Sequence, residues 1–237
     1  MKKKIILLCL ITAFIAAQGF AIGAIEQISP EKSKEIIGKI RSISVPRYKD
    51  FSGVESRRNV EVKEYDASNK LLVTHKYVVD RKDFFYIMPE SKVLKYEKDG
   101  KEKKSSEYKE LLSEPSYPVF DEKGERYYDT SVVSVQMLDG NKCYKIKVTP
   151  KQATERHFSG YLYYKTDDFE PYFLEGSIGK LPWSLKEFSM RFYFTKEKGY
   201  PMLKSGVMNV KINVPVLMPN RKIDTTINVF ETKMIPN

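Results

Sequence analysis

The chain has few of the residues on which most catalytic and metal sites depend. Its 237 residues include two His, two Cys and one Trp. Histidine is the commonest general base, and Cys and His are the usual zinc ligands. Gly-x-Ser-x-Gly, His-Glu-x-x-His, a phosphate-binding Gly loop and Cys-x-x-Cys are all missing from the sequence. We therefore predict that the protein is not an enzyme and has no resident cofactor or metal.

Glycine and proline are also scarce, at 12 residues each, which excludes collagen-like and linker-like chains. After the first two dozen residues no apolar run is long enough to span a bilayer. Hydrophobic residues nevertheless make up 41% of the chain, enough for a real core. The aromatic residues are mostly Tyr and Phe, with 16 and 13 copies, and both favour β-strands.

The N-terminus has the pattern of a secretory signal peptide. Lys2 to Lys4 form a basic start, residues 5–17 are apolar apart from Thr12, and small residues follow. We expect cleavage after Ala21, with Ala24 as the second choice, and export to the periplasm. The alternative is an uncleaved anchor, for which the apolar run is short.

The charge balance is basic. A net charge of +10 falls to +7 when the three lysines of residues 1–21 are removed. Export argues against nucleic acid as a partner, so anionic lipid head groups or an acidic protein surface are better candidates. A well-charged surface that only keeps the protein soluble is an equally good interpretation.

Three reactive groups have plain structural interpretations. Cys143 is the only cysteine after the predicted cleavage site, so we expect no intramolecular disulfide. It shares a strand face with Lys145 and Lys147, which predicts a partly exposed or covered thiol, and we expect this thiol to be inert. His75 shares a strand face with Val73 and Tyr77, which predicts a half-buried imidazole. The acidic run Asp167-Asp168 with Glu170 is typical of a turn and lacks the ligand spacing of a calcium loop.

One helix is predicted near the start of the mature chain. Ser29 can cap it, Pro30 suits its first turn, and apolar residues at 36, 37 and 40 form one stripe over residues 30–42. Val45-Pro46 is expected to end this helix. A second short helix is a candidate at residues 105–112.

The rest of the chain alternates with period two, which predicts strands. A first strand includes Val60, a second covers residues 71–79, and a third covers 84–88. Turns are expected at 66–69, at 89–91, at Asp99-Gly100 and at Asp139-Gly140-Asn141. The predicted fold class is mainly β (α+β): one strongly curved antiparallel sheet or unclosed β-barrel, with one or two covering helices. We expect residues 22–237 to form a single domain.

Large apolar side chains recur on one face of several predicted strands, so that face must be covered. It is either an ordinary packed core or a cavity for an apolar ligand, because the two have the same sequence pattern. The alternation at 84–88 also leaves open whether Phe84 or Phe85 faces inward. We take the candidate ligand-binding residues to be Phe84, Tyr86, Met88, Phe188, Met190, Phe192, Phe194, Met208, Val210 and Ile212.

The order of these elements resembles the LolA/LolB-like family, the periplasmic lipoprotein carriers and their outer-membrane lipoprotein-sorting relatives. The resemblance covers about residues 29–234. Its features are the leader followed by a helix at 29–41, paired strands at 71–77 and 84–88, the hairpin from Gly140-Asn141-Lys142-Cys143-Tyr144 to Pro150-Lys151, and the strand at 160–164 followed by Phe169-Glu170-Pro171.

The resemblance implies a curved antiparallel sheet lidded by helices, with an apolar inside that holds acyl chains. It implies no catalytic residue. The expected partners are therefore lipid or lipoprotein acyl chains. The alternative function is an envelope interaction or sensor module, whose sheet is filled by its own side chains and which binds membrane-associated envelope proteins.

Overall fold

The computed structural model describes residues 28–84, 88–104, 118–197, 200–214 and 218–237. The predicted signal peptide, the candidate helix at 105–112 and Tyr86 lie outside these residues.

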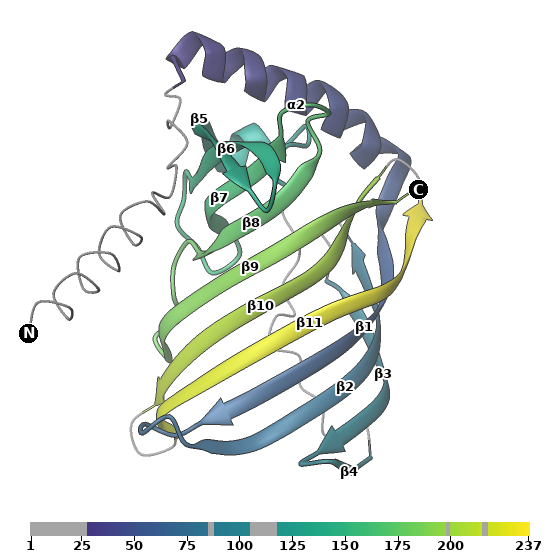
Figure 1. The fold of residues 1–237 in the computed structure, drawn as a ribbon, viewed down its shortest axis with the longest axis vertical. Helices are drawn as coiled ribbons and strands as arrows, with labels where there is room; N and C mark the ends of the chain where they lie inside the picture. The colour runs from purple at the N-terminus through teal and green to yellow at the C-terminus, as the bar shows by residue number, and fades with distance from the viewer. Residues whose placement is uncertain (1–27, 85–87, 105–117, 198–199, 215–217) are drawn as a thin grey trace, which may run out of the picture.

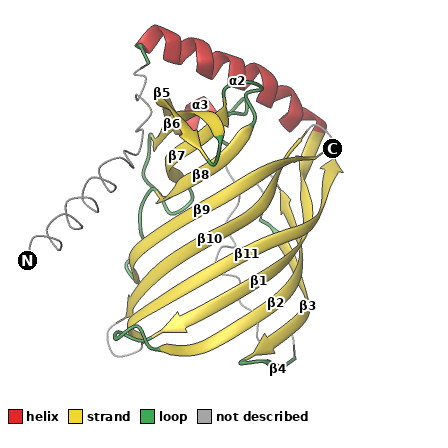
Figure 2. Ribbon diagram, viewed as in Figure 1, coloured by secondary structure: helices red, strands yellow, loops and turns green. Residues whose placement is uncertain are grey.

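Within the described residues the chain forms one antiparallel sheet (Figures 1 and 2). Its strands are β1 (Phe51–Tyr65), β2 (Leu71–Phe84), β3 (Glu90–Lys98), β4 (Lys101–Glu102), β5 (Tyr128–Leu138), β6 (Asn141–Pro150), β7 (Phe158–Lys165), β8 (Pro171–Ile178), β9 (Leu185–Glu197), β10 (Tyr200–Val214) and β11 (Met218–Pro236).

The strand order is β4-β3-β2-β1-β11-β10-β9-β8-β7-β6-β5. The first long strand, β1, therefore pairs with the last, β11, in the middle of the sheet. The sheet curls strongly (Figure 1) but does not close, because β5 and the β3–β4 hairpin remain at its two edges. The predicted fold class, a curved and unclosed antiparallel sheet with covering helices, is confirmed.

Two predicted hairpin turns have the expected geometry. Asp139 and Gly140 connect β5 to β6 with φ values of 48° and 80°. Asp99 and Gly100 connect β3 to β4 with φ values of 50° and 75°. Positive φ at both central residues is what a type I′ turn requires, and Asp-Gly is among the pairs that adopt it most readily.

The second strand, predicted at residues 71–79, is longer than expected, because β2 continues without interruption to Phe84, where a third strand was expected to begin. The charged side chains of this added length are paired across strands. Arg57 Nε donates to Asp80 Oδ1 at 2.6 Å, and Arg58 pairs with Asp83. The turn expected at 89–91 is also misplaced, since β3 already begins at Glu90.

Helix α2 (Pro30–Asp50) begins where the sequence predicts and ends eight residues later than predicted. Ser29 Oγ accepts from the Lys32 amide at 3.2 Å, as expected of an N-cap. Pro46 lies inside the helix and does not end it. Proline removes one backbone donor but has a helical φ, and ion pairs of Arg47 and Lys49 hold the last turn in place.

One face of α2 packs against the end of the sheet formed by β5, β6 and β7 (Figure 1). Ile36 and Ile40 are 2% and 0% exposed. They lie in a cluster with Phe120, Val132, Ile146 and Tyr164. Ser33 Oγ also accepts from the Val132 amide at 2.8 Å. The short helix α3 (Gly124–Tyr127) precedes β5 beside this cluster.

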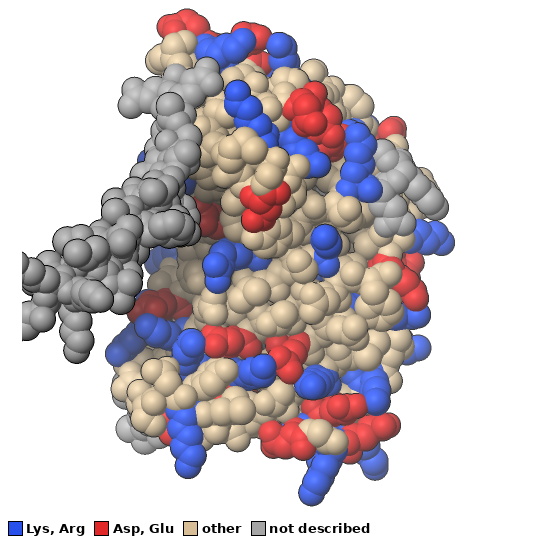
Figure 3. Space-filling model, in the orientation of Figure 1, with Lys and Arg blue, Asp and Glu red and all other residues tan. Residues whose placement is uncertain are grey.

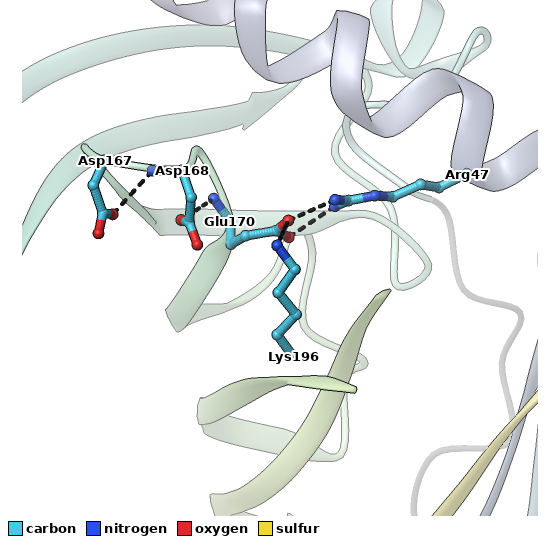
Figure 4. A network of polar contacts seen from close by, with 5 residues as sticks. All are labelled: Arg47, Asp167, Asp168, Glu170 and Lys196. Atoms are coloured by element: carbon cyan, nitrogen blue, oxygen red, sulfur yellow. Dashed lines mark hydrogen bonds and ion pairs between the residues drawn. The ribbon is translucent and has the colours of Figure 1, made fainter. Parts of the chain in front are cut away.

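A buried ion network fastens the C-terminal part of α2 to the sheet (Figure 4). Glu170 is 4% exposed, in the connection between β7 and β8. Its carboxylate accepts from Arg47 Nη1 at 2.7 Å and from Nη2 at 2.5 Å, and it lies 2.9 Å from Lys196 Nζ on β9. Asp168 Oδ1 accepts from the Glu170 amide at 3.0 Å, so the predicted acidic turn positions this carboxylate.

The network controls the ionisation of Glu170. Burial alone raises the pKa of a carboxyl group. The hydrogen bonds and positive charges of Arg47 and Lys196 outweigh that effect and hold the pKa of Glu170 below its usual value of 4.5. Glu170 therefore remains ionised in the fold and joins three elements that are distant in the sequence.

Replacing Glu170 by Gln is expected to lower the free energy of unfolding at pH 7 by about 2 kcal/mol, because two cationic donors lose a charged acceptor. A carboxyl group with a lowered folded-state pKa stabilises the fold above its unfolded-state pKa, and this contribution is lost as the pH falls through the folded-state value. Urea unfolding of wild type and variant should therefore show the full difference at pH 7 and a shrinking one below about pH 4.5.

The matched control is Glu122→Gln. Glu122 lies 2.6 Å from Lys49 Nζ on the same helix, but both side chains are about 60% exposed. Exposed ion pairs contribute little. We expect this variant to unfold at nearly the wild-type urea concentration, and an equal loss in both variants would contradict a special role for the buried network.

Candidate functional site

The inner apolar face of the sheet is the candidate functional site. We define it by the side of β9 and β10 that carries Phe188, Met190, Phe192, Met208 and Val210. Phe188 is directly opposite Val210, and Met190 is opposite Met208. Residues that are opposite one another in neighbouring strands point to the same side of a sheet. Five of the predicted ligand-binding residues are thus brought together.

The same face continues across β11 and β1. Met208 is opposite Thr225, and Val210 is opposite Ile223. Thr225 is in turn opposite Val62 on β1. The result is a hydrophobic cluster that runs over six strands, and its buried members are Val62, Tyr77, Val79, Tyr96, Phe188, Met208, Val210, Ile223 and Ile227.

Burial is uneven over this face. Phe188, Met208 and Val210 are 8%, 5% and 5% exposed, whereas Met190 and Phe192 are only partly buried. Partly buried Ile212 also packs against the cluster. No described side chain of α2 or α3 belongs to the cluster. Among the described residues, neither helix therefore covers this part of the inner face, which is packed only by side chains of the sheet and of the loop before β9.

The Phe192 ring packs closely against the neighbouring strand. It is opposite Gly206 on β10, and a Cβ added to Gly206 would meet the Phe192 ring at 2.0 Å. Glycine is therefore the residue that allows the ring to approach β10 so closely. The sequence contains a signal for this contact, since Gly206 interrupts a run of strand-forming residues, but the signal does not identify the partner.

The other predicted site residues lie apart from the cluster. Phe194 is opposite Leu203, close to an irregularity in the β9–β10 pairing. Phe84 ends β2 and is opposite Gly53 of β1. Met88 is 49% exposed between β2 and β3. With Tyr86 outside the described residues, the ligand-binding role of all ten residues stays a prediction.

An aromatic stack forms the β2–β3 side of the inner face. The rings of Tyr77 and Tyr96 are parallel within 7°, with centroids 4.8 Å apart. His75 stacks beside both rings, and its Nδ1 lies 2.9 Å from the Tyr96 hydroxyl. Its Nε2 lies 3.4 Å from Glu64. His75 is therefore partly buried, as predicted. Its partner, Tyr96 on β3, could not be predicted, because sequence spacing does not reveal the register of β2 and β3.

Charged residues border the cluster toward the start of β1. Ser56, Arg58, Val60 and Val62 occupy every second position of β1, so all four point to the inner face. Arg58 Nε donates to Ser56 Oγ at 2.7 Å, and Arg58 and Arg81 both bind the Asp83 carboxylate. Sequence spacing gives no signal for this group, because its members lie on two strands whose pairing periodicity does not reveal.

The opposite face of the sheet contains Cys143. Cys143 is 0% exposed and packs with Tyr163 and Phe173. Burial raises the pKa of its thiol to about 11. In the described part of the chain, no group of three or more His, Cys, Asp and Glu residues is arranged to hold a metal ion. No described helix is both long enough and apolar enough to cross a bilayer.

Comparison with known proteins gives remote likenesses only. No family model matches the chain, and the search of curated proteins returns no relative. Among solved structures, the chain is similar to a LolA superfamily protein from Nitrosomonas europaea, with 12% identity and a TM-score of 0.43 over 86% of this chain and 94% of the other. A DUF1329 family protein from Desulfovibrio piger has 12% identity and a TM-score of 0.45 over 84% of this chain and 90% of the other.

The MucA/MucB complex of Pseudomonas aeruginosa contains a further similar chain, with 9% identity and a TM-score of 0.25 over 86% of this chain and 99% of the other. The family that the sequence resembles is thus found again among the structural matches. Because the TM-scores lie below 0.5, the proposals below depend on the geometry of this chain alone.

The burial of Cys143 makes a direct prediction about its reactivity. At pH 8 a buried thiol with a raised pKa has little thiolate, and an aromatic disulfide reagent cannot reach it. In a Cys9→Ser chain we expect labelling of the native protein to be slower than labelling in denaturant by about a hundredfold or more. Rapid labelling of the native protein would contradict the described packing of β6.

Proposed function

We propose that the protein is a non-enzymatic periplasmic carrier or binding protein for lipid acyl chains, either as free lipid or on a lipoprotein, and that the chains lie against the inner apolar face. The observation that carries the proposal is the extent of this face. It runs over β9, β10, β11, β1, β2 and β3, and neither helix contributes a described side chain to it.

The chemistry of the face suits an alkyl chain better than a polar ligand. Its centre consists of Phe, Met, Val, Ile and Tyr side chains. Burial of each CH₂ group contributes about 0.8 kcal/mol, which corresponds to about a fourfold gain in affinity for each added methylene. Methionine adapts its shape readily, so Met190 and Met208 suit chains that differ in length or unsaturation.

A second function is supported by a different observation. Phe188, Met208 and Val210 at the centre of the face are already buried by their neighbours. A sheet filled by its own side chains would serve as an envelope interaction or sensor module that binds a partner protein. The two functions differ in whether the protein takes up an acyl chain in solution.

The variant Phe192→Glu tests the first function. A carboxylate on the inner face should repel an alkyl chain, because burying a charge in apolar surroundings is costly. Titration with a fluorescent fatty acid should show tight binding to wild type, with affinity rising with chain length, and at least about a tenfold loss in the variant. Circular dichroism would show whether the variant is folded.

Ser189→Glu is the matched control, since Ser189 is exposed on the opposite face of the same strand. It should bind the probe as wild type does. A folded Phe192→Glu protein that binds the probe normally would exclude this face as the binding site. A wild-type protein that takes up no probe would favour the interaction module.

A further inference from the structure

One end of the curved sheet gathers several loops side by side. Tyr65 at the end of β1 is opposite both Leu71 of β2 and Lys222 of β11, and Lys222 is opposite Lys211 of β10. The Asn213 amide donates to the Ser184 carbonyl at 3.0 Å, which brings the loop before β9 to the same end. We call this end the open rim, formed by residues 66–72, 98–104, 179–186 and 220–222. In Figure 1 it follows the lower left edge of the sheet and continues along the bottom to the β3–β4 hairpin.

The open rim exposes large apolar side chains. Trp183 is 81% exposed, and Leu71 and Leu72 are 48% and 42% exposed. The loop around Trp183 is held firmly, because the Leu185 amide donates to the Pro182 carbonyl at 2.9 Å and Leu181 packs against the inner apolar cluster. Trp183 therefore points outward from a fixed turn.

Lysines flank these side chains. Residues 98–104 contain four lysines and two acidic residues, and Lys70, Lys180 and Lys186 are exposed on the neighbouring loops. An open hollow of ≈ 390 Å³ is lined by Lys98, Asp99, Lys101 and Lys103. Lysine and arginine side chains project along the lower edge in Figure 3, with aspartate and glutamate side chains between them.

The turn aspartates of the rim are engaged by the backbone. Asp66 Oδ1 accepts from the amides of Ser68 and Lys70, at 2.8 and 3.0 Å. Asp99 Oδ1 accepts from the Thr74 amide at 2.9 Å. These carboxylates stabilise the turns, and the ammonium groups beside them project into solvent.

We propose that the open rim docks on the surface of a bilayer that contains anionic phospholipid. Trp183, Leu71 and Leu72 enter the interface between head groups and acyl chains, where tryptophan is favoured. The lysines of residues 98–104 face the lipid phosphates, to which clustered basic residues are attracted. Leu71 and Leu72 lie at the start of β2 and Trp183 lies in the loop before β9, so the apolar side chains are spread along a row of strand ends. This arrangement matches a broad, fluid surface.

The role of this docking rests on the proposed function, because docking would serve to deliver an acyl chain to the inner face. Helix α2 covers the β5–β7 part of the inner face, whereas the open rim lies at the ends of the strands that form the inner apolar cluster. When the open rim is docked on a bilayer, an acyl chain could pass from the bilayer directly onto the hydrophobic cluster of the inner face. Docking itself can be measured independently of acyl-chain binding.

The single tryptophan makes the test direct. On mixing the protein with vesicles of phosphatidylglycerol and phosphatidylcholine, Trp183 emission should shift to the blue, and brominated lipid should quench it. Co-flotation should weaken at high ionic strength and be lost with pure phosphatidylcholine. Unchanged Trp183 emission in protein that co-floats, or equal binding to both vesicle types, would overturn the proposal.

Variants test the two parts of the rim. Trp183→Ala should reduce vesicle binding by about tenfold, as expected if the side chain is about half buried in the bilayer. Met137→Ala is its control, since Met137 is 62% exposed at the end of β5. Lys101→Glu with Lys103→Glu should weaken binding, whereas Lys34→Glu on the exposed side of α2 should not. Wild-type binding by both rim variants would overturn the proposal.

Two further outcomes separate this inference from the proposed function. Trp183→Ala should still take up the soluble fatty-acid probe, and Phe192→Glu should still bind vesicles. If wild type binds vesicles through Trp183 but takes up no probe, docking stands and the carrier function fails. If the protein ignores vesicles and cross-links to an envelope protein through Trp183, the rim is a protein interface and the docking proposal fails.

Discussion

The candidate site depends on the register in which β9, β10, β11 and β1 pair. Between Gly206 and Val210 the pairings with β9 and β11 run without a shift, so every second residue faces inward on each strand. A slip by one residue would turn Met208 and Val210 outward and bring Asn209 and Lys211 into the core. The close contact between Gly206 and the Phe192 ring helps to fix this register, because a larger residue at position 206 would clash with the ring.

The two ends of the molecule are built differently around that face. At one end, α2 is fastened by apolar packing and by the buried network of Arg47, Glu170 and Lys196. At the other end, the loops expose Trp183 and lysines on a hydrogen-bonded framework. A fixed lid at one end and an apolar, basic rim at the other would give an acyl chain one direction of approach, through the rim.

Local sequence patterns predicted much of the sheet and little of its long-range order. Alternation identified which residues of β9 and β10 share a face, and Asp-Gly pairs identified two hairpin turns, because both signals depend on neighbouring residues. The pairing of β1 with β11 could not be predicted, since periodicity says nothing about which strands are neighbours. The continuation of β2 through residues 80–83 could not be predicted either, because the partners of its charged side chains, Arg57 and Arg58, lie on another strand. The extension of α2 past Pro46 likewise depends on tertiary ion pairs.

The central claim is that the inner apolar face holds acyl chains. The most direct measurement is organic extraction of protein purified without detergent, followed by mass spectrometry of the extract. The account predicts a phospholipid or other acyl species in stoichiometric amount, which is lost from a folded Phe192→Glu protein. A wild-type protein that yields no lipid and takes up no fatty-acid probe would contradict it, and the face would then be an ordinary packed core.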